Sequence, residues 1–186
     1  IGRNGSGKST ILTLLAGIYL PTSGSITVRG RVGSLLEVAA GFHPEMTAED
    51  NAILSAMIQG LGRQDALDRL PDIIEFAGLA QFADAKMKHF SSGMYLRLGF
   101  SVVGHLQPDV LLVDEILAVG DEAFQRQCRE TLRRMQAESG TTVVFVSHDL
   151  ETIADIASRV IWLDSGTVRM TGPTDEVLAA YRAAAQ

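Results

Sequence analysis

"IGRNGSGKST", residues 1–10, is the stretch that decides the fold. Gly2, Gly7, Lys8 and Ser9 match the pattern G-x-x-x-x-G-K-[ST], in which glycines let backbone N–H groups converge on phosphate oxygens. Lys8 is expected to reach the β- and γ-phosphates, and Ser9 to place its hydroxyl on Mg²⁺. A chance match has a probability of roughly one per cent or less, which disfavours a glycine-rich turn that only caps a helix. The predicted nucleoside triphosphate site comprises Gly2, Arg3, Asn4, Gly5, Ser6, Gly7, Lys8, Ser9 and Thr10.

Composition bounds the class of protein. The chain has 186 residues, of which 46% are hydrophobic and 20% charged, enough for one substantial core and one soluble globular domain. A net charge of −6 argues against a general nucleic-acid binder. No apolar run reaches the 18 residues of a membrane span, and no secretion leader is expected. Cys128 cannot form an internal disulfide, which fits a reducing compartment.

Strand-like and helix-like segments alternate along the chain. Continuous apolar runs at 109–115 and 141–149 are typical of strands covered on both faces. Pro71 is expected to open a helix, because proline is tolerated in the first turn and disfavoured inside. Alternation of this kind predicts a mainly parallel sheet covered by helices. The expected strands are 25–30, 31–38, 109–115 and 141–149, with a hairpin at 160–172, and the expected helices are 9–17, 47–62, 71–78, 93–106, 121–138 and 174 onward.

Two carboxylates end the strand at 109–115, at the edge where ligands bind in parallel sheets. Asp114 fits the role of holding Mg²⁺, and Glu115 would polarise the attacking water. His148 follows the next strand and is expected to hydrogen-bond the γ-phosphate and orient that water. Ser147, His148 and Asp149 do not predict a hydrolase triad, because neighbours in an extended chain point to opposite faces.

The segment "FSSGMYLRLGFSV", residues 90–102, carries a Ser-Ser-Gly turn at a helix start. Hydroxyls, free N–H groups and the helix dipole together make a second anion site. An ordinary N-cap explains the same residues, and the spacing alone leaves both interpretations open.

The order of phosphate loop, "SSGM", "LLVDE" and "VSHD" resembles the nucleotide-binding domain of ABC transporters over essentially the whole chain. In that family two domains pair head to tail, so the signature of one closes on the ATP held by the other. The resemblance implies a P-loop NTPase fold with an inserted helical subdomain at about 44–106, within one ATPase domain spanning 1–186. It also implies a signature at Ser91, Ser92, Gly93 and Met94, a D-loop aspartate at Asp121, and the switch histidine at His148.

Departures from the usual motifs narrow the subfamily. Phe-Ser-Ser-Gly-Met replaces Leu-Ser-Gly-Gly-Gln, and "EILAVGD" at 115–121 replaces the commoner continuation. Both resemble the ATPases that export teichoic acids, O-antigens and other polysaccharides. Glu37 stands where the family has the Q-loop glutamine. The resemblance implies ATP and Mg²⁺, a homodimer, and a multi-span membrane permease at the cytoplasmic face of the membrane, touched by "GFHPEMT" at 41–47.

In the family the phosphate loop follows a buried strand and an antiparallel portion with an adenine-stacking aromatic residue. Neither precedes Ile1 here, so the sequence is expected to be N-terminally truncated. Unpaired backbone groups of buried strands cost about 1 to 3 kcal/mol each, so the 186 residues alone are expected to fold poorly or to aggregate.

Other functions remain possible interpretations of the same motifs. They are an ABC ATPase for another cargo, a catalytically silent nucleotide-binding module, and a non-transport ABC protein acting on ribosomes or DNA. Lys8, Asp114, Glu115 and His148 together argue against a silent module. Non-transport members usually carry two such domains in one chain, and one set of motifs is visible here.

Overall fold

A computed structural model describes residues 1–35, 41–114 and 121–184. The helices are α1 (Lys8–Leu15), α3 (Ala48–Ile58), α4 (Arg63–Ala77), α5 (Ser92–Gly104), α6 (Glu122–Glu138), α7 (Leu150–Ile156) and α8 (Thr174–Ala184), with short 3₁₀ turns at Ala80–Phe82 and Met87–His89. The strands are β1 (Val32–Ser34), β2 (Val110–Val113), β3 (Thr142–Phe145), β4 (Arg159–Asp164) and β5 (Thr167–Pro173).

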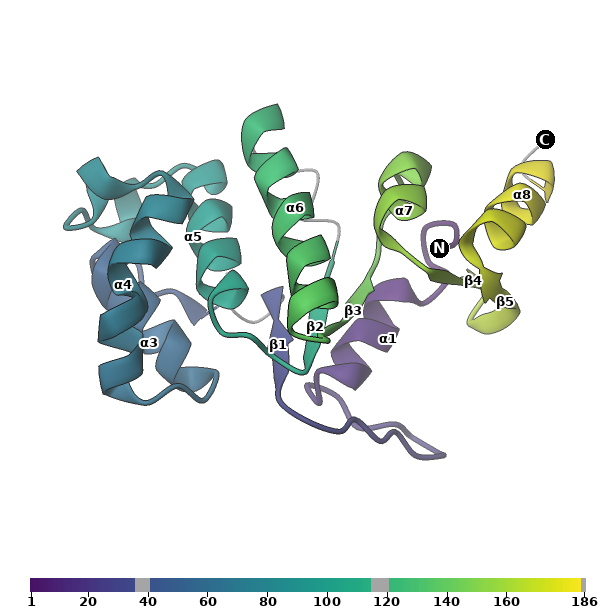
Figure 1. The fold of residues 1–186 in the computed structure, drawn as a ribbon. Helices are drawn as coiled ribbons and strands as arrows, with labels where there is room; N and C mark the ends of the chain where they lie inside the picture. The colour runs from purple at the N-terminus through teal and green to yellow at the C-terminus, as the bar shows by residue number, and fades with distance from the viewer. Residues whose placement is uncertain (36–40, 115–120, 185–186) are drawn as a thin grey trace.

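Strands β1, β2 and β3 form a parallel sheet in that order, and β4 and β5 form a separate antiparallel hairpin (Figure 1). Val110 of β2 lies beside Val32 of β1 and Thr142 of β3, so all three strands end at the same edge. The parallel sheet predicted from the apolar runs is therefore confirmed.

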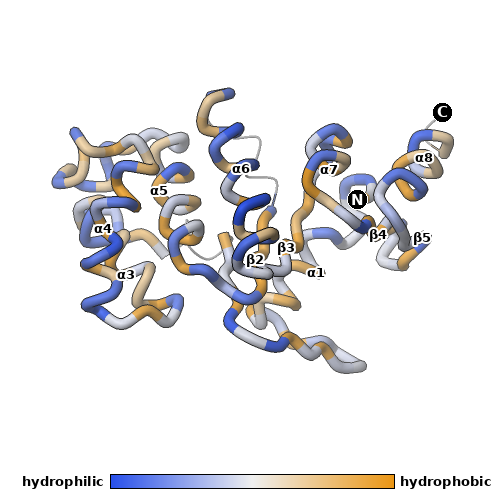
Figure 2. Tube along the Cα trace, viewed as in Figure 1, coloured by the Kyte–Doolittle hydropathy of each residue, from blue (hydrophilic) through white to orange (hydrophobic). Residues whose placement is uncertain are grey.

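Alternate residues along β2 and β3 face opposite layers of helices. On one face, Leu112 of β2 and Val146, which directly follows β3, pack with Leu12 of α1. On the other face, Leu111 and Val113 join the large core that includes α5 and α6. Figure 2 shows that β2 and β3 are mostly apolar and that α6 is mostly hydrophilic. Helix α6 is hydrophilic because only one side of it is buried. Its buried residues are Phe124, Cys128, Thr131, Leu132 and Met135.

Helices α3, α4 and α5 pack together beside the sheet (Figure 1). Phe76 of α4 stacks against Phe100 of α5, and both rings meet Phe124 of α6 edge-on. This aromatic group joins the helices to the layer that covers the sheet. Helices α3, α4 and α5 all lie within the predicted helical subdomain of about 44–106. That these residues form a separate subdomain stays a prediction.

Two predicted elements are wrong. Residues 25–30 form no strand and take part in neither of the described sheets. Pro71 does not open a helix but lies inside α4, which begins at Arg63. Buried Ala66 before the proline and buried Ile73 and Ile74 after it hold both halves of α4 on the core, which offsets the cost of an interior proline.

The β4–β5 hairpin is hydrogen-bonded to Ile1 at the start of the given sequence. The backbone N–H of Leu163 donates to the carbonyl of Ile1 at 2.8 Å, and the amino group of Ile1 donates to the carbonyl of Ile161 at 2.8 Å. Strand β3 pairs with β2 on one side. Beside β3 lies a groove of about 410 Å³, which β3, β4, α1 and Ile1 line.

Candidate functional site

The phosphate loop folds as a series of tight turns that lead directly into α1. The N–H of Ser6 donates to the carbonyl of Arg3 at 3.1 Å, and the N–H of Ile11 to the carbonyl of Gly7 at 3.0 Å. Gly5 and Gly7 have φ angles of 79° and 99°, which glycine adopts without strain. Gly7 is the N-cap of α1, so the free N–H groups of the helix start beside the loop.

The β4–β5 hairpin supports this loop from outside. A Cβ atom on Gly2 would lie 2.4 Å from the carbonyl oxygen of Leu163, so only glycine fits there. The N–H of Gly166 in the hairpin turn donates to the carbonyl of Ser6 at 3.2 Å. Sequence reasoning missed Leu163 and Gly166 because no local pattern signals contacts over such a separation.

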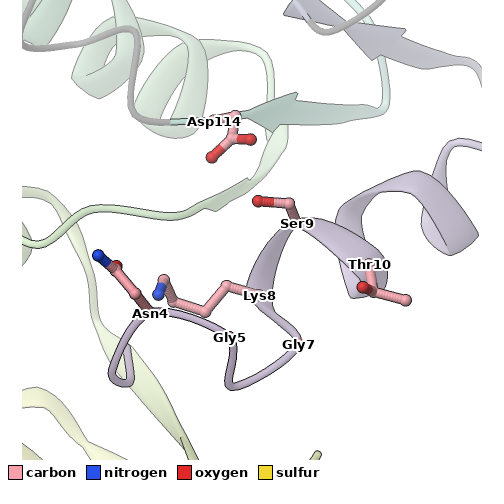
Figure 3. Close-up of a pocket in the computed structure, with 7 residues that line it drawn as sticks. All are labelled: Asn4, Gly5, Gly7, Lys8, Ser9, Thr10 and Asp114. Carbon is pink, nitrogen blue, oxygen red and sulfur yellow. The ribbon is translucent and has the colours of Figure 1, made fainter.

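A cavity of about 420 Å³ opens in front of the loop (Figure 3). Ser9, on the first turn of α1, lies toward Asp114, which directly follows β2. The structure thus brings two residues more than a hundred positions apart into one cavity. The described lining residues are Asn4, Gly5, Gly7, Lys8, Ser9, Thr10 and Asp114.

Lys8 is almost fully buried, and its ammonium group is held by the loop itself. Nζ donates to the carbonyl of Gly2 at 2.9 Å and to the carbonyl of Arg3 at 3.1 Å. The ammonium group is therefore held at the cavity wall by two uncharged acceptors. An anion would offer it a stronger, charge-assisted hydrogen bond.

The donor set of the cavity fits a phosphate group and a hard divalent cation. Backbone N–H groups at the start of α1 and Lys8 suit phosphate oxygens, and the Ser9 hydroxyl with the Asp114 carboxylate suits Mg²⁺. Within residues 1–35, 41–114 and 121–184, no group of three histidine, cysteine or acidic side chains could hold a metal by itself. Magnesium is usually bound by one or two protein side chains together with phosphate oxygens of the substrate. Ser9 and Asp114 agree with such a site.

Two predicted site residues, Glu115 and Glu37, lie outside the described residues. The signature residues are described and do not line the phosphate cavity. Ser91 is the N-cap of α5, and its Oγ accepts from the N–H of Met94 at 3.2 Å. Ser92, Gly93 and Met94 form the first turn of α5. The geometry is that of an N-cap, and its use as an anion site stays a prediction.

Asp121 and His148 also lie outside the described lining of the cavity. Asp121 is the N-cap of α6, and its Oδ1 accepts from the N–H of Phe124 at 2.9 Å. That backbone hydrogen bond, with the Arg97 guanidinium, holds the pKa of Asp121 below its usual range. His148 is exposed in the turn between β3 and α7, beside Asp149, which caps α7. Catalytic roles for both residues stay predictions.

The segment 41–47 is anchored by Asn51 of α3. The N–H of His43 donates to Oδ1 of Asn51 at 2.6 Å, while Nδ2 donates to the carbonyls of His43 and Thr47. Glu45 forms ion pairs with Lys86 and Lys88, which precede the Ser-Ser-Gly turn. The ion pairs thus hold the segment 41–47 against the residues that lead into α5.

Comparison with known proteins gives consistent results. A family model described as ABC transporter matches residues 1–118. The O-antigen export system ATP-binding protein RfbB of Klebsiella pneumoniae is 45% identical over 184 residues, which are 99% of this chain and 74% of that protein. The teichoic acids export ATP-binding protein TagH of Shouchella clausii is 39% identical over 181 residues, 97% of this chain and 50% of that protein.

A solved structure supports the fold. The ATP-binding cassette MJ0796, in a dimeric post-hydrolysis state bound to ADP and Pi, matches with a TM-score of 0.80 at 23% identity. The match covers 93% of this chain and 83% of that chain. At this identity the likeness shows the fold alone, and it confirms the predicted P-loop NTPase class.

Proposed function

Because the chain belongs to the ABC transporter family, we propose that it is the ATP-hydrolysing subunit of an exporter of cell-surface polysaccharide of the O-antigen, teichoic acid or capsule type. The observation that carries the proposal is the convergence of Lys8, Ser9 and Asp114 on one cavity. The names of the similar export proteins favour the polysaccharide cargo. ATP and Mg²⁺ are the proposed ligands.

Lys8, Ser9 and Asp114 in the cavity, together with Glu115 and His148, each have a proposed task. Lys8 exchanges the carbonyls of Gly2 and Arg3 for oxygens of the β- and γ-phosphates, and the loop N–H groups bind the remaining oxygens. Bound Mg²⁺, held by Ser9 and Asp114, would neutralise charge on the transferred phosphoryl group. Glu115 polarises the attacking water, and His148 orients it.

A second copy of the chain is the proposed partner across this site. The described lining of the cavity comes from the phosphate loop, the start of α1 and Asp114, whereas the Ser91–Met94 turn at the start of α5 is not part of it. In a head-to-tail pair, the free N–H groups at the start of α5 would meet the γ-phosphate held by the other copy. ATP would then draw two subunits together, and hydrolysis would release them.

We further propose that a multi-span membrane subunit is the second partner, and that it holds the chain at the cytoplasmic face of the membrane. No helix in the described ranges is long and apolar enough to cross a bilayer. The proposed contact is the segment 41–47 with the start of α3. Helix α3 buries small residues, while the large apolar side chains of Leu54, Met57 and Ile58 are exposed. Exposed apolar side chains on one helix favour the proposal that another subunit covers this side of α3.

The variant Glu115→Gln tests the mechanism in the full-length protein. Glutamine keeps the shape of the side chain but cannot polarise water, so ATP turnover should fall at least 100-fold while ATP binding remains. ATP-bound dimers should accumulate, because the step that separates them is blocked. Phosphate release and analytical ultracentrifugation with ATP measure the two effects.

The control is Lys8→Met, which should abolish both ATP binding and ATP-dependent dimers. A Glu115→Gln protein that stays monomeric with bound ATP would refute the proposed dimer cycle. Full turnover in the same variant would refute the role of Glu115.

A further inference from the structure

Arg97 joins the two helices that begin with predicted ATP-facing residues. It lies in the second turn of α5, about 9 Å along the helix axis from the Ser91 cap. Its Nη2 lies 2.6 Å from Oδ2 of Asp121, the N-cap of α6. The side chain of Arg97 is 27% exposed and that of Asp121 is 63% exposed.

The contact is held from a second direction by an aromatic ring. The Cζ atom of Arg97 lies 5.0 Å from the ring centroid of Phe124, which belongs to the first turn of α6. Phe124 in turn packs against Phe100 and Phe76. The guanidinium is therefore fixed between a carboxylate and an aromatic cluster, which distinguishes it from a freely moving surface ion pair.

Asp121 uses its two carboxylate oxygens for two different partners. Oδ1 accepts from the N–H of Phe124 and so fixes the start of α6, while Oδ2 accepts from Arg97 and fixes α6 to α5. A shift of the α6 start would therefore be transmitted to α5 through one side chain.

We propose that Arg97 is a positioning residue that holds the Ser91–Met94 turn in register with the start of α6, so that both meet the phosphate bound by a second copy. The inference rests on the proposed ATPase function. Arg97 itself lies outside the described lining of the phosphate cavity, so it should act on turnover and leave ATP binding by a single subunit unchanged.

The test compares Arg97→Gln, Arg97→Lys, Asp121→Asn and the double variant Arg97→Gln/Asp121→Asn in the full-length protein. Asparagine retains an oxygen for the Phe124 N–H but loses the charge, so it removes the ion pair and keeps the helix cap. Arg169→Gln is the matched control. Arg169 pairs with Asp164 at 3.3 Å and lies 4.3 Å over the ring of Trp162 in the β4–β5 hairpin.

We expect kcat for ATP to fall about fivefold in Arg97→Gln and in Asp121→Asn. Affinity for a fluorescent ATP analogue, measured on dilute monomer, should stay within about twofold of wild type, since an interaction needed only in the closed pair does not affect initial binding. The double variant should be no slower than either single variant, because both remove the same contact. Arg97→Lys should recover part of kcat, and Arg169→Gln should match wild type.

Unchanged kcat in Arg97→Gln, with active wild type, would overturn this inference and leave the ATPase proposal intact. Equal loss of analogue binding, kcat and melting temperature would also overturn it, because the role would then be structural. Additive losses in the double variant would show that Arg97 and Asp121 act separately. Absence of turnover in the wild type would overturn both proposals.

Discussion

Gly2 is the residue at which the phosphate loop passes the backbone of the hairpin. Its missing side chain allows the close approach to the Leu163 carbonyl, and a methyl group there would overlap that oxygen and Ser6 Oγ. Backbone oxygen cannot move aside as a flexible side chain could, so the loop and hairpin would have to separate.

We predict that Gly2→Ala lowers the free energy of unfolding by about 2 to 4 kcal/mol and weakens ATP binding. Gly5→Ala is the control, since Gly5 also has a positive φ but a Cβ there meets no atom within 4 Å. Its cost should be about 1 kcal/mol, from backbone strain alone. Urea unfolding of both variants checks the difference. Equal midpoints would contradict the importance of the Leu163 contact.

Among the individual site residues, those that belong to short local sequence motifs were predicted from the sequence. Lys8 and Ser9 came from spacing within one loop, and Asp114 from its place after an apolar strand; all three line the cavity. The Arg97–Asp121 pair could not be predicted, because arginine and aspartate are common surface residues. Their meeting depends on how two helices cross.

Helix α7 shows how a single cap controls a short element. Asp149 accepts from the N–H groups of Glu151 and Thr152 and from the Thr152 hydroxyl. The hydrogen bond from the Thr152 side chain, followed by those from the backbone, lowers the pKa of Asp149. Because the folded state favours the carboxylate, this stability is present above the unfolded pKa and is lost as pH falls through the folded one.

The free energy of unfolding should therefore fall as pH drops below about 4. Asp149→Asn keeps an acceptor but cannot titrate, so its loss of stability over the same range should be smaller. Asp149→Ala should cost about 1 kcal/mol at neutral pH. Urea titrations at several pH values measure all three proteins. Identical acid slopes for wild type and Asp149→Asn would show that Asp149 contributes nothing to the pH dependence.

Elements with a strong local signal were predicted well. Strands β2 and β3 are continuous apolar runs, and α6 begins at an aspartate and ends before Gly140. The run at 25–30 has strand-forming residues, but strand formation also needs a partner, which composition does not reveal. Helix α7 was not predicted, since its seven residues carry too short a pattern.

Among the strands that the structure describes, β3 forms one edge of the parallel sheet, and an edge strand is a site of weakness for the whole molecule. β3 pairs with β2 on one side and borders the groove of about 410 Å³ beside β4. Thr142 is exposed and Val143, Val144 and Phe145 are half-buried, so this edge of β3 is not sealed inside the core. Exposed strand edges also pair with other chains.

We predict that residues 1–186, expressed alone, give a broad and irreversible thermal transition with light scattering that grows with protein concentration. Differential scanning calorimetry with repeated scans and static light scattering are the measurements. A sharp melt that recovers fully on cooling would contradict the prediction.

The contact between the phosphate loop and the hairpin also sets an order of events during synthesis. The loop is the first part of this stretch to leave the ribosome, yet its supports at Leu163 and Gly166 are made about 160 residues later. Contacts so distant in sequence form late in folding. A nascent chain released before Gly166 would thus carry the complete glycine pattern without its support, so competence to hold nucleotide should be acquired only after Gly166 has been synthesised.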